Sequence, residues 1–186
     1  TLSRASDGTF TATLVDQSSW HFDSSGRLTS LVDRFGNTST LTYNTSGQLT
    51  AVSDPAGHGS LSLTYGPVGT SCPSGRLCSV SDWQSPSART TSFGYDSSGR
   101  LTSVTDRLGK TTTYGYDSTS ARVTTTTDPL SHTQVTNHFD GQGRVDQQTD
   151  ALGKQTTYSY TANSDGTQTT TATTTRGSPM APSRFS

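Results

Sequence analysis

The sequence has few apolar residues, little charge and no long hydrophobic run. Hydrophobic residues make up 27% of the 186 residues, charged residues make up 15%, and the formal net charge is −1. A chain without a basic surface has no electrostatic basis for binding nucleic acid. No stretch approaches the roughly 20 consecutive apolar residues of a membrane-spanning helix, so we expect no membrane span.

The start of the sequence has neither an initiator Met nor a recognisable signal peptide. Thr1 stands where an initiator Met would, and the residues after it do not form the apolar core of a signal peptide. We interpret the chain as a processed product or as a piece of a longer protein. Low apolar content alone would suggest disorder, but charge-driven disorder usually comes with a large net charge, which this chain lacks.

What the sequence does contain is a repeat built on an aromatic residue. In its clearest copies Asp or Asn follows the aromatic, and Gly comes four positions after it, as in Tyr95-Asp96-Ser97-Ser98-Gly99. The aromatic anchors are Phe22, Tyr43, Tyr65, Tyr95, Tyr116, Phe139 and Tyr160. They are separated by 21, 22, 30, 21, 23 and 21 residues, so only one interval is irregular. Such a period is typical of a repeat architecture.

A second motif, Asp-x-x-Gly, lies between the anchors. Asp33-Arg34-Phe35-Gly36 is one copy, and Asp128-Pro129-Leu130-Ser131 is a variant. Asp accepts a hydrogen bond from the backbone two residues on, and Gly adopts the positive φ that closes the turn. Both motifs are typical of a type I turn followed by a glycine bulge, a common hairpin connection. The predicted turn glycines are Gly26, Gly36, Gly47, Gly57, Gly99, Gly109, Gly143 and Gly153.

The two kinds of turn alternate, which leaves strands of roughly six or seven residues between them. Connections this short exclude the crossovers that parallel strands need, so the sheet must be antiparallel. A bulky residue two positions before most anchors, such as Leu41 before Tyr43, predicts one apolar face, and Ser and Thr fill the other. Leu28 and Leu31 are three positions apart, which predicts a β-bulge or a strand end.

We therefore predict an all-β fold of tandem antiparallel β-hairpin repeats of about 21 residues in a continuous sheet. Twist between neighbouring strands accumulates, so we expect this sheet to be curved or spiral. Residues 1–20 are expected to form one or more strands that lead into the repeat array. Residues 21–176 are expected to form it, with an insertion at residues 66–92, and residues 177–186 to be a short tail.

The only two cysteines, Cys72 and Cys78, lie in the irregular interval. An isolated pair in a long insertion favours a disulfide, which is typical of a secreted or cell-surface protein. Two free thiols are the alternative. A redox centre is disfavoured, because the spacing is not Cys-x-x-Cys.

No residue pattern points to catalysis or to a bound cofactor. His21, His58, His132 and His138 lack the spacing of metal ligands, and the recurring Asp residues lack the Gly-Gly-x-Gly-x-Asp pattern of calcium β-rolls. No nucleophile motif or acid–base pair is distinguishable. We expect no enzymatic activity and assign no catalytic, cofactor-binding or metal-binding residue.

The segment from Tyr95 to Tyr114, YDSSGRLTSVTDRLGKTTTY, resembles one unit of the RHS or YD-repeat family. Residues 22–36 and 139–158 resemble the same unit with Phe in place of Tyr, and the resemblance covers roughly residues 20–175. It implies hairpins that wind into a hollow β-shell. Such shells enclose a C-terminal toxin in bacterial polymorphic toxins and insecticidal toxin complexes, and form an extracellular barrel in teneurins.

The sequence departs from that family in two respects. Neither the motif that closes and self-cleaves such shells nor a toxin region is recognisable. Asp54-Pro55-Ala56-Gly57 fits the register of an ordinary turn.

Together these features predict a structural, non-catalytic, secreted or cell-surface protein that forms part of a β-shell or extracellular assembly. The alternative is a cell-surface adhesin or glycan-binding module that uses exposed aromatic residues. Residues 7–15 and 167–175 predict strands at the two ends, without the charge or proline that blunts a sheet edge. The expected partners are the remainder of a longer repeat chain or other copies joined by β-strand addition, including filaments. Glycans or an enclosed toxin are further partners that the resemblance and the aromatic residues suggest.

Overall fold

The computed structural model describes residues 1–68, 71–84 and 89–175. These residues form sixteen β-strands, and none of them lies in a helix. The strands are β1 (Leu2–Arg4), β2 (Phe10–Thr13), β3 (Ser19–Phe22), β4 (Leu28–Val32), β5 (Thr38–Tyr43), β6 (Leu49–Ser53), β7 (Ser60–Tyr65), β8 (Leu77–Ser81), β9 (Thr90–Tyr95), β10 (Leu101–Thr105), β11 (Thr111–Tyr116), β12 (Val123–Thr127), β13 (Thr133–Phe139), β14 (Val145–Asp150), β15 (Gln155–Ala162) and β16 (Gln168–Thr175).

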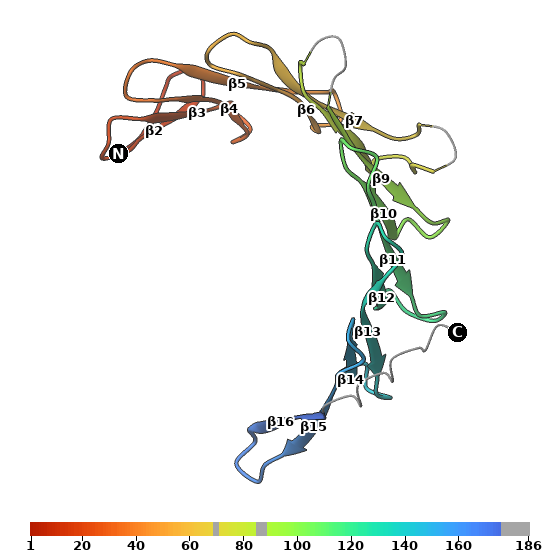
Figure 1. Ribbon diagram of the computed structural model, residues 1–186. Helices are drawn as coiled ribbons and strands as arrows, with labels where there is room; N and C mark the ends of the chain where they lie inside the picture. The colour runs from red at the N-terminus through yellow and green to blue at the C-terminus, as the bar shows by residue number, and fades with distance from the viewer. Residues whose placement is uncertain (69–70, 85–88, 176–186) are drawn as a thin grey trace. The chain divides into compact units, whose positions relative to one another are not determined.

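The strands belong to two compact units. The first contains the chain up to Gly99 and the turn Asp106–Leu108, and the second contains Arg100–Thr105 and the described residues from Gly109 onward. Within each unit the strands follow one another in chain order and pair antiparallel, β1 to β9 in the first and β10 to β16 in the second (Figure 1). The predicted all-β fold of tandem antiparallel hairpins is confirmed. The tail at residues 177–186 lies outside the described residues.

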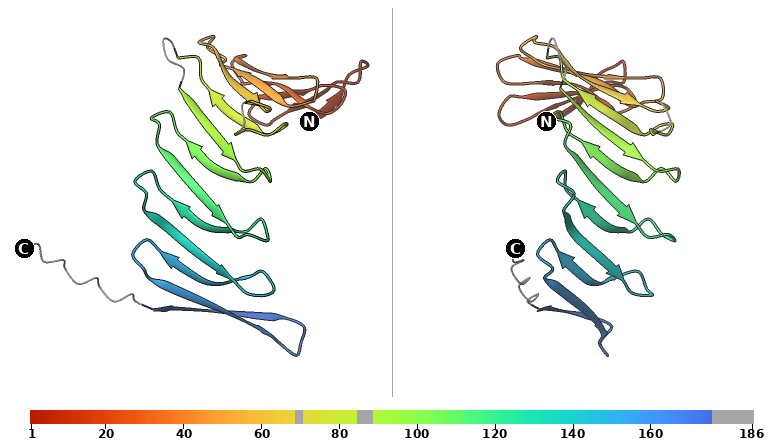
Figure 2. Two further views of the ribbon diagram at one scale, coloured as in Figure 1. Left: turned by 90° about the vertical axis from the view of Figure 1, so that its right-hand side faces the viewer. Right: turned by 45° about the vertical axis from the view of Figure 1, so that its right-hand side comes forward.

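Two kinds of turn close the hairpins. Anchor turns follow an aromatic anchor, as at residues 23–26, and return turns carry the second motif, as at residues 33–36. In both, the Gly N–H donates to the Asp carbonyl, at 2.9 Å for Gly26 and 3.1 Å for Gly36. All eight predicted turn glycines have φ between 74° and 86°, the left-handed region that glycine adopts without strain. Figure 2 shows that the two kinds of turn lie at opposite sides of the sheet in the second unit.

The sequence motifs missed the turns at residues 5–8, 14–17 and 163–166. In these turns the aspartate occupies the third position, and Asp16, for example, accepts from the Ser18 N–H at 3.1 Å. Gln17 takes the place of the glycine with φ of 70°. A search for aspartate at the first position therefore could not find them.

Cross-strand register places the anchors on one face of each sheet, the apolar face. Phe22 lies opposite Leu28, and Tyr43 lies opposite Leu49. Opposite residues of antiparallel strands share a face. The other face, the hydroxyl face, carries pairs such as Ser103 and Thr113.

The spacing of three between Leu28 and Leu31 corresponds to a bulge, as predicted. The register shifts between His21 and Phe22, so Thr29 has no opposite residue and both leucines lie on the apolar face. The Thr29 hydroxyl donates to the His21 carbonyl at 3.1 Å. The same shift occurs opposite β6 and β8.

Almost no side chain in these single-layer sheets is fully buried. Among the described residues only Cys72 and Cys78 are buried, with 4% and 8% of their surface exposed. Stability must therefore come from contacts between neighbouring strands and repeats rather than from a closed core.

Candidate functional site

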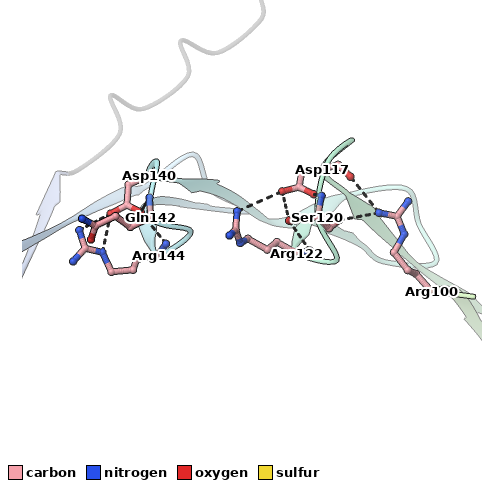
Figure 3. Close-up of polar contacts among 7 residues, drawn as sticks. All are labelled: Arg100, Asp117, Ser120, Arg122, Asp140, Gln142 and Arg144. Atoms are coloured by element: carbon pink, nitrogen blue, oxygen red, sulfur yellow. Dashed lines mark hydrogen bonds and ion pairs between the residues drawn. The ribbon is translucent and has the colours of Figure 1, made fainter. Parts of the chain in front are cut away.

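Aspartate side chains hold the anchor turns in shape. In the turn at residues 140–143, Asp140 Oδ1 accepts from the N–H groups of Gln142 and Arg144, each at 2.9 Å (Figure 3). Asp140 Oδ2 accepts from Arg144 Nε at 2.8 Å. Both carboxylate oxygens are thus occupied within the turn, which fixes the direction of the arginine side chain.

These bonds favour the ionised carboxylate. The backbone N–H of Arg144 holds the pKa of Asp140 below its ordinary value, desolvation opposes this, and the Arg144 side chain adds to the lowering. The backbone N–H of Arg27 lowers the pKa of Asp23 in the same way. At neutral pH these aspartates act as charged turn caps, not as proton donors.

The arginine that follows the anchor turn at residues 140–143 reaches the next repeat. The guanidinium carbon of Arg144 lies 4.1 Å from the centroid of the Tyr160 ring. The Tyr160 hydroxyl donates to the carbonyl of Val145 at 2.6 Å. Two consecutive residues therefore hold one anchor of the following hairpin, by a cation–π contact and a hydrogen bond. We call this pair of interactions the anchor clamp.

The anchor clamp recurs along the chain. Arginines lie over anchors at 5.4 Å for Arg27 and Tyr43, 4.7 Å for Arg100 and Tyr116, and 5.6 Å for Arg122 and Phe139. Hydroxyl-to-carbonyl bonds join Tyr43 to Leu28 at 2.8 Å, Tyr95 to Leu77 at 2.8 Å and Tyr116 to Leu101 at 2.7 Å. Each clamp links a hairpin to its immediate neighbour, which is the energetic pattern of a repeat protein.

Arg100 extends its clamp to the following turn. Its Nη1 donates to the carbonyls of Asp117 at 3.2 Å and Ser120 at 2.9 Å (Figure 3). In that turn Arg122 Nη1 lies 3.9 Å from Asp117 Oδ2. Successive arginines in the second unit thus connect one anchor turn with the next.

The clamp is complete at Tyr43, Tyr116 and Tyr160 and differs at the other anchors. Phe139 has no hydroxyl, and Asn137 instead donates to the Val123 carbonyl at 3.1 Å. Tyr65 has no arginine over its ring in the described part of the chain, because Gln48 stands at the arginine position and donates to the Gly75 carbonyl at 3.1 Å.

The glycines of the two turn types have different surroundings. A Cβ at Gly99 would lie 3.4 Å from Arg76 Nη2, and a Cβ at Gly143 would overlap the Arg122 guanidinium. At Gly109 and Gly153 nothing lies within 4 Å. Gly99 and Gly143 therefore leave room for the arginine of the preceding repeat, in addition to supplying positive φ, whereas at Gly26 nothing lies within 4 Å.

Cys72 and Cys78 form a disulfide, with their Cα atoms 5.6 Å apart. Cys78 follows Leu77 at the bulge of β8. The Ser71 carbonyl accepts from the N–H of Tyr95 at 3.1 Å. The insertion is thus attached to both β8 and β9.

The histidines make local contacts. His132 Nδ1 lies 3.3 Å from Asp128 Oδ2, and His138 Nδ1 lies 2.6 Å from Asp146 Oδ1. The His58 ring stacks on Trp83, with 6.5 Å between centroids. Across residues 1–68, 71–84 and 89–175, no three His, Cys, Asp or Glu side chains are placed to hold a metal ion. The same residues include no helix of the length and apolarity that a membrane crossing requires.

The sequence motifs did not assign a role to the clamp arginines. A signal was present, because Gly-Arg-Leu recurs at Gly26-Arg27-Leu28, Gly75-Arg76-Leu77 and Gly99-Arg100-Leu101. The arginine contacts an aromatic in the next repeat, about 16 residues later, so no local turn rule connects the two.

Solved structures with a similar fold come from Tc toxin complexes. The TcdB2–TccC3–Cdc42 complex matches with a TM-score of 0.50 and 18% identity over 94% of this chain and 10% of that chain. The TcdB2–TccC3 complex matches with a TM-score of 0.49 and 19% identity over 94% of this chain and 11% of that chain. This chain spans about a tenth of the length of the chains it matches. The match with a TM-score of 0.50, at 18% identity, shows the fold alone.

A search of curated proteins gave no match. The model of the teneurin YD-shell family matches residues 16–180, well over half of the sequence. The chain therefore belongs to the teneurin YD-shell family of RHS/YD-repeat proteins.

Proposed function

We propose that this chain forms a stretch of wall in a YD-type β-shell or a related extracellular assembly. The observation that carries the proposal is the anchor clamp, which at Tyr43, Tyr116 and Tyr160 links one hairpin to the next through the same two interactions. A wall built this way lengthens by adding repeats, because each repeat needs only its neighbours. The role of the chain is structural, and the charged aspartates stabilise the turns of the wall instead of taking part in a reaction.

The disulfide supports a location outside the reducing cytosol, since such bonds persist in oxidising compartments. The Cys72–Cys78 pair closes the insertion into a short loop against β8. A secreted or cell-surface protein fits this arrangement.

The end strands supply the contacts to partners. Among the described strands, β1 pairs only with β2 and β16 pairs only with β15. All eight residues of β16 are exposed, and the strand contains neither a charged residue nor proline. An open edge of this kind accepts another strand, so further YD repeats or another copy would continue the sheet. Extension into filaments and enclosure of a toxin belong to the same proposal.

Native mass spectrometry of the protein isolated from its source tests the proposal. We expect it outside the cytosol, in particles heavier than one 19.6 kDa chain. Ala172→Lys should dissociate copies joined at β16, because a charge at this edge position opposes strand addition. Ser164→Lys, in the adjoining turn, is the matched control and should leave the particles intact. A cytosolic 19.6 kDa monomer would contradict the proposal.

A glycan-binding adhesin is the second candidate. Trp20 supports it, because this residue is 44% exposed and lies opposite Leu31 on the apolar face. Aromatic rings on an open face can stack on sugar rings. Titration calorimetry with oligosaccharides should then show binding that Trp20→Ala abolishes and Leu152→Ala retains. The absence of heat with the unmodified protein would exclude the oligosaccharides tested.

A further inference from the structure

Two adjoining hollows lie on the hydroxyl face of the second unit. The larger, of about 630 Å³, begins at the return turn before β13, and its lining includes His132, Gln134, Thr136 and Thr149. The smaller, of about 350 Å³, is lined by His138, Asp146, Gln147 and Thr157.

Cross-strand register makes the two hollows neighbours. Thr136 lies opposite Thr149, and His138 lies opposite Gln147, so the hollows occupy successive pairs on one face of β13 and β14. From His132 to His138 they extend over roughly 20 Å at the usual rise per residue. We call the two hollows together the polar groove.

The histidine and aspartate at the smaller hollow are not required by the repeat. Asp146 is the residue without an opposite partner at the bulge of β14. At the bulges of β4 and β6 the Thr29 and Thr50 hydroxyls each donate to a carbonyl of the preceding strand at 3.1 Å. A carboxylate cannot make that bond, and Asp146 Oδ1 instead lies 2.6 Å from His138 Nδ1. A local rule that is broken without a structural gain indicates a functional position.

Carboxylates orient the histidines at both ends of the polar groove. Asp128 Oδ2 lies 3.3 Å from His132 Nδ1, in the same manner as Asp146 beside His138. An ionised carboxylate only accepts, so each Nδ1 donates and each Nε2 of the neutral ring is left as an acceptor. Neither Nε2 has a partner in the described part of the chain, and both side chains are exposed.

Between the two histidines the polar groove presents uncharged groups. The hydroxyls of Thr136 and Thr149 and the amide of Gln147 have no hydrogen-bond partner among the described residues. The described lining contains the carboxylates of Asp146 and Asp150 but no lysine or arginine. A phosphate or sulfate group would therefore be repelled. The lining suits a neutral ligand whose groups both donate and accept hydrogen bonds.

The backbone beneath the polar groove is already fully paired. β13 lies between β12 and β14, β14 lies between β13 and β15, and β15 lies between β14 and β16. A peptide cannot add here as a further strand, because strand addition needs a free edge. A ligand must therefore be recognised through the side chains alone.

We propose that the polar groove binds a neutral oligosaccharide that lies along β13. A sugar hydroxyl both donates and accepts, so it can donate to Nε2 of His132 or His138 and bond to the hydroxyls of Thr136 and Thr149. One sugar ring is too short to reach both histidines across roughly 20 Å, whereas a chain of rings can do so. The proposal shares its ligand class with the second candidate function. The polar groove lies on other strands than Trp20, so each proposal can fail without the other.

A titration followed by NMR of the threonine methyl groups tests the proposal on the unmodified chain. The probes are cellotetraose, chitotetraose and mannotetraose. With at least one of them, the signals of Thr136, Thr149 and Thr157 should shift, and the matching monosaccharide should bind about tenfold more weakly or less. The absence of shifts with all three up to about 10 mM would overturn the proposal, as would shifts confined to other threonines or equal affinity for both lengths.

Histidine variants with matched controls locate the contact. His132→Ala and His138→Ala should each weaken Kd by about 3–10-fold, the usual value of one hydrogen bond. His58→Ala is the control for His132, because His58 pairs with Asp54 in a return turn of the first unit. His21→Ala is the control for His138, since His21 also precedes an anchor but has both ring nitrogens bonded to hydroxyls.

Both controls should leave Kd unchanged, and so should Trp20→Ala. Equal losses for the histidine variants and their controls would overturn the proposal. Binding that Trp20→Ala abolishes while His132→Ala and His138→Ala retain it would also overturn it, and would assign the sugar to the apolar face of the first unit.

Discussion

The hydroxyl of Tyr116 donates to the backbone carbonyl of Leu101 at 2.7 Å, while Arg100 lies 4.7 Å from the centre of the Tyr116 ring. Two adjacent residues of one hairpin thus hold a single side chain of the next. In a sheet without a buried core, such contacts between neighbours must supply much of the cooperativity. They are therefore the first places where substitutions should be informative.

Tyr116→Phe should lower the free energy of unfolding by about 1 kcal/mol, because the Leu101 carbonyl loses its donor while the ring keeps its contact with Arg100. Urea unfolding followed by circular dichroism measures the change. Tyr114→Phe is the matched control, since Tyr114 lies on the same face of β11 and its hydroxyl has no hydrogen-bond partner in the described part of the chain. Equal losses for the two variants would contradict a role for the hydroxyl bond.

Gly143→Ala should destabilise the protein more than Gly153→Ala. Both glycines have positive φ, so each change costs about 1 kcal/mol for the left-handed backbone. At Gly143 the new Cβ would also displace the Arg122 guanidinium from Phe139, which adds roughly 0.5–1 kcal/mol.

The same unfolding experiment in an Arg122→Ala background supplies the control. There the two glycine variants should cost the same, because no guanidinium remains to be displaced. A persistent difference between them would show that the arginine is not the cause.

The repeat, most turns that begin with aspartate or asparagine, and the bulges were predictable from the sequence because they are local. An aspartate, a glycine three residues later and a pair of leucines three apart each determine structure within a few residues. The clamp between Arg144 and Tyr160 is not local. The contact depends on the register between one hairpin and the next. The bulges change that register, and no single motif encodes it.

A recurring leucine in the return turns could have been noticed in the sequence, since Leu130 and Leu152 occupy the same place in their motifs. What the sequence could not indicate was their exposure. Alternating patterns predict which face of a strand is apolar, but a turn residue belongs to neither face. Only the structure shows that Leu152 is 90% exposed.

Acid should destabilise the protein through the anchor-turn aspartates. The backbone N–H of Arg144 lowers the pKa of Asp140, so its carboxylate stabilises the fold above the unfolded pKa of about 4. That contribution is lost as the pH falls through the lower folded pKa. The Tm should therefore drop on acidification below about pH 4.

Asp140→Asn provides the comparison for this pH dependence. The variant should have a lower Tm at pH 7 and a smaller further drop on acidification, because one titrating cap is gone. Scanning calorimetry over the acid range checks both. A Tm that rises as the pH falls would have the wrong sign for depressed aspartate pKa values.

Asn137 and Phe139 together should supply the two interactions that a single tyrosine makes in the complete clamp: the hydrogen bond and the cation–π contact. Asn137 donates to the Val123 carbonyl at 3.1 Å and accepts from Gln148 Nε2 at 2.9 Å. Asn137→Ala should lower the free energy of unfolding by about 1–2 kcal/mol, because it leaves both groups without this partner.

Phe139→Tyr adds a hydroxyl at the anchor position from which Tyr116 reaches the carbonyl of the preceding repeat. In the unmodified protein that carbonyl is already bonded, so Phe139→Tyr should change stability by less than about 0.5 kcal/mol. In the Asn137→Ala background the same change should recover about 1 kcal/mol, because the new hydroxyl then supplies the missing donor. Urea unfolding of the four proteins in this cycle measures the coupling. If Phe139→Tyr had the same effect in both backgrounds, Asn137 would not be substituting for the tyrosine hydroxyl.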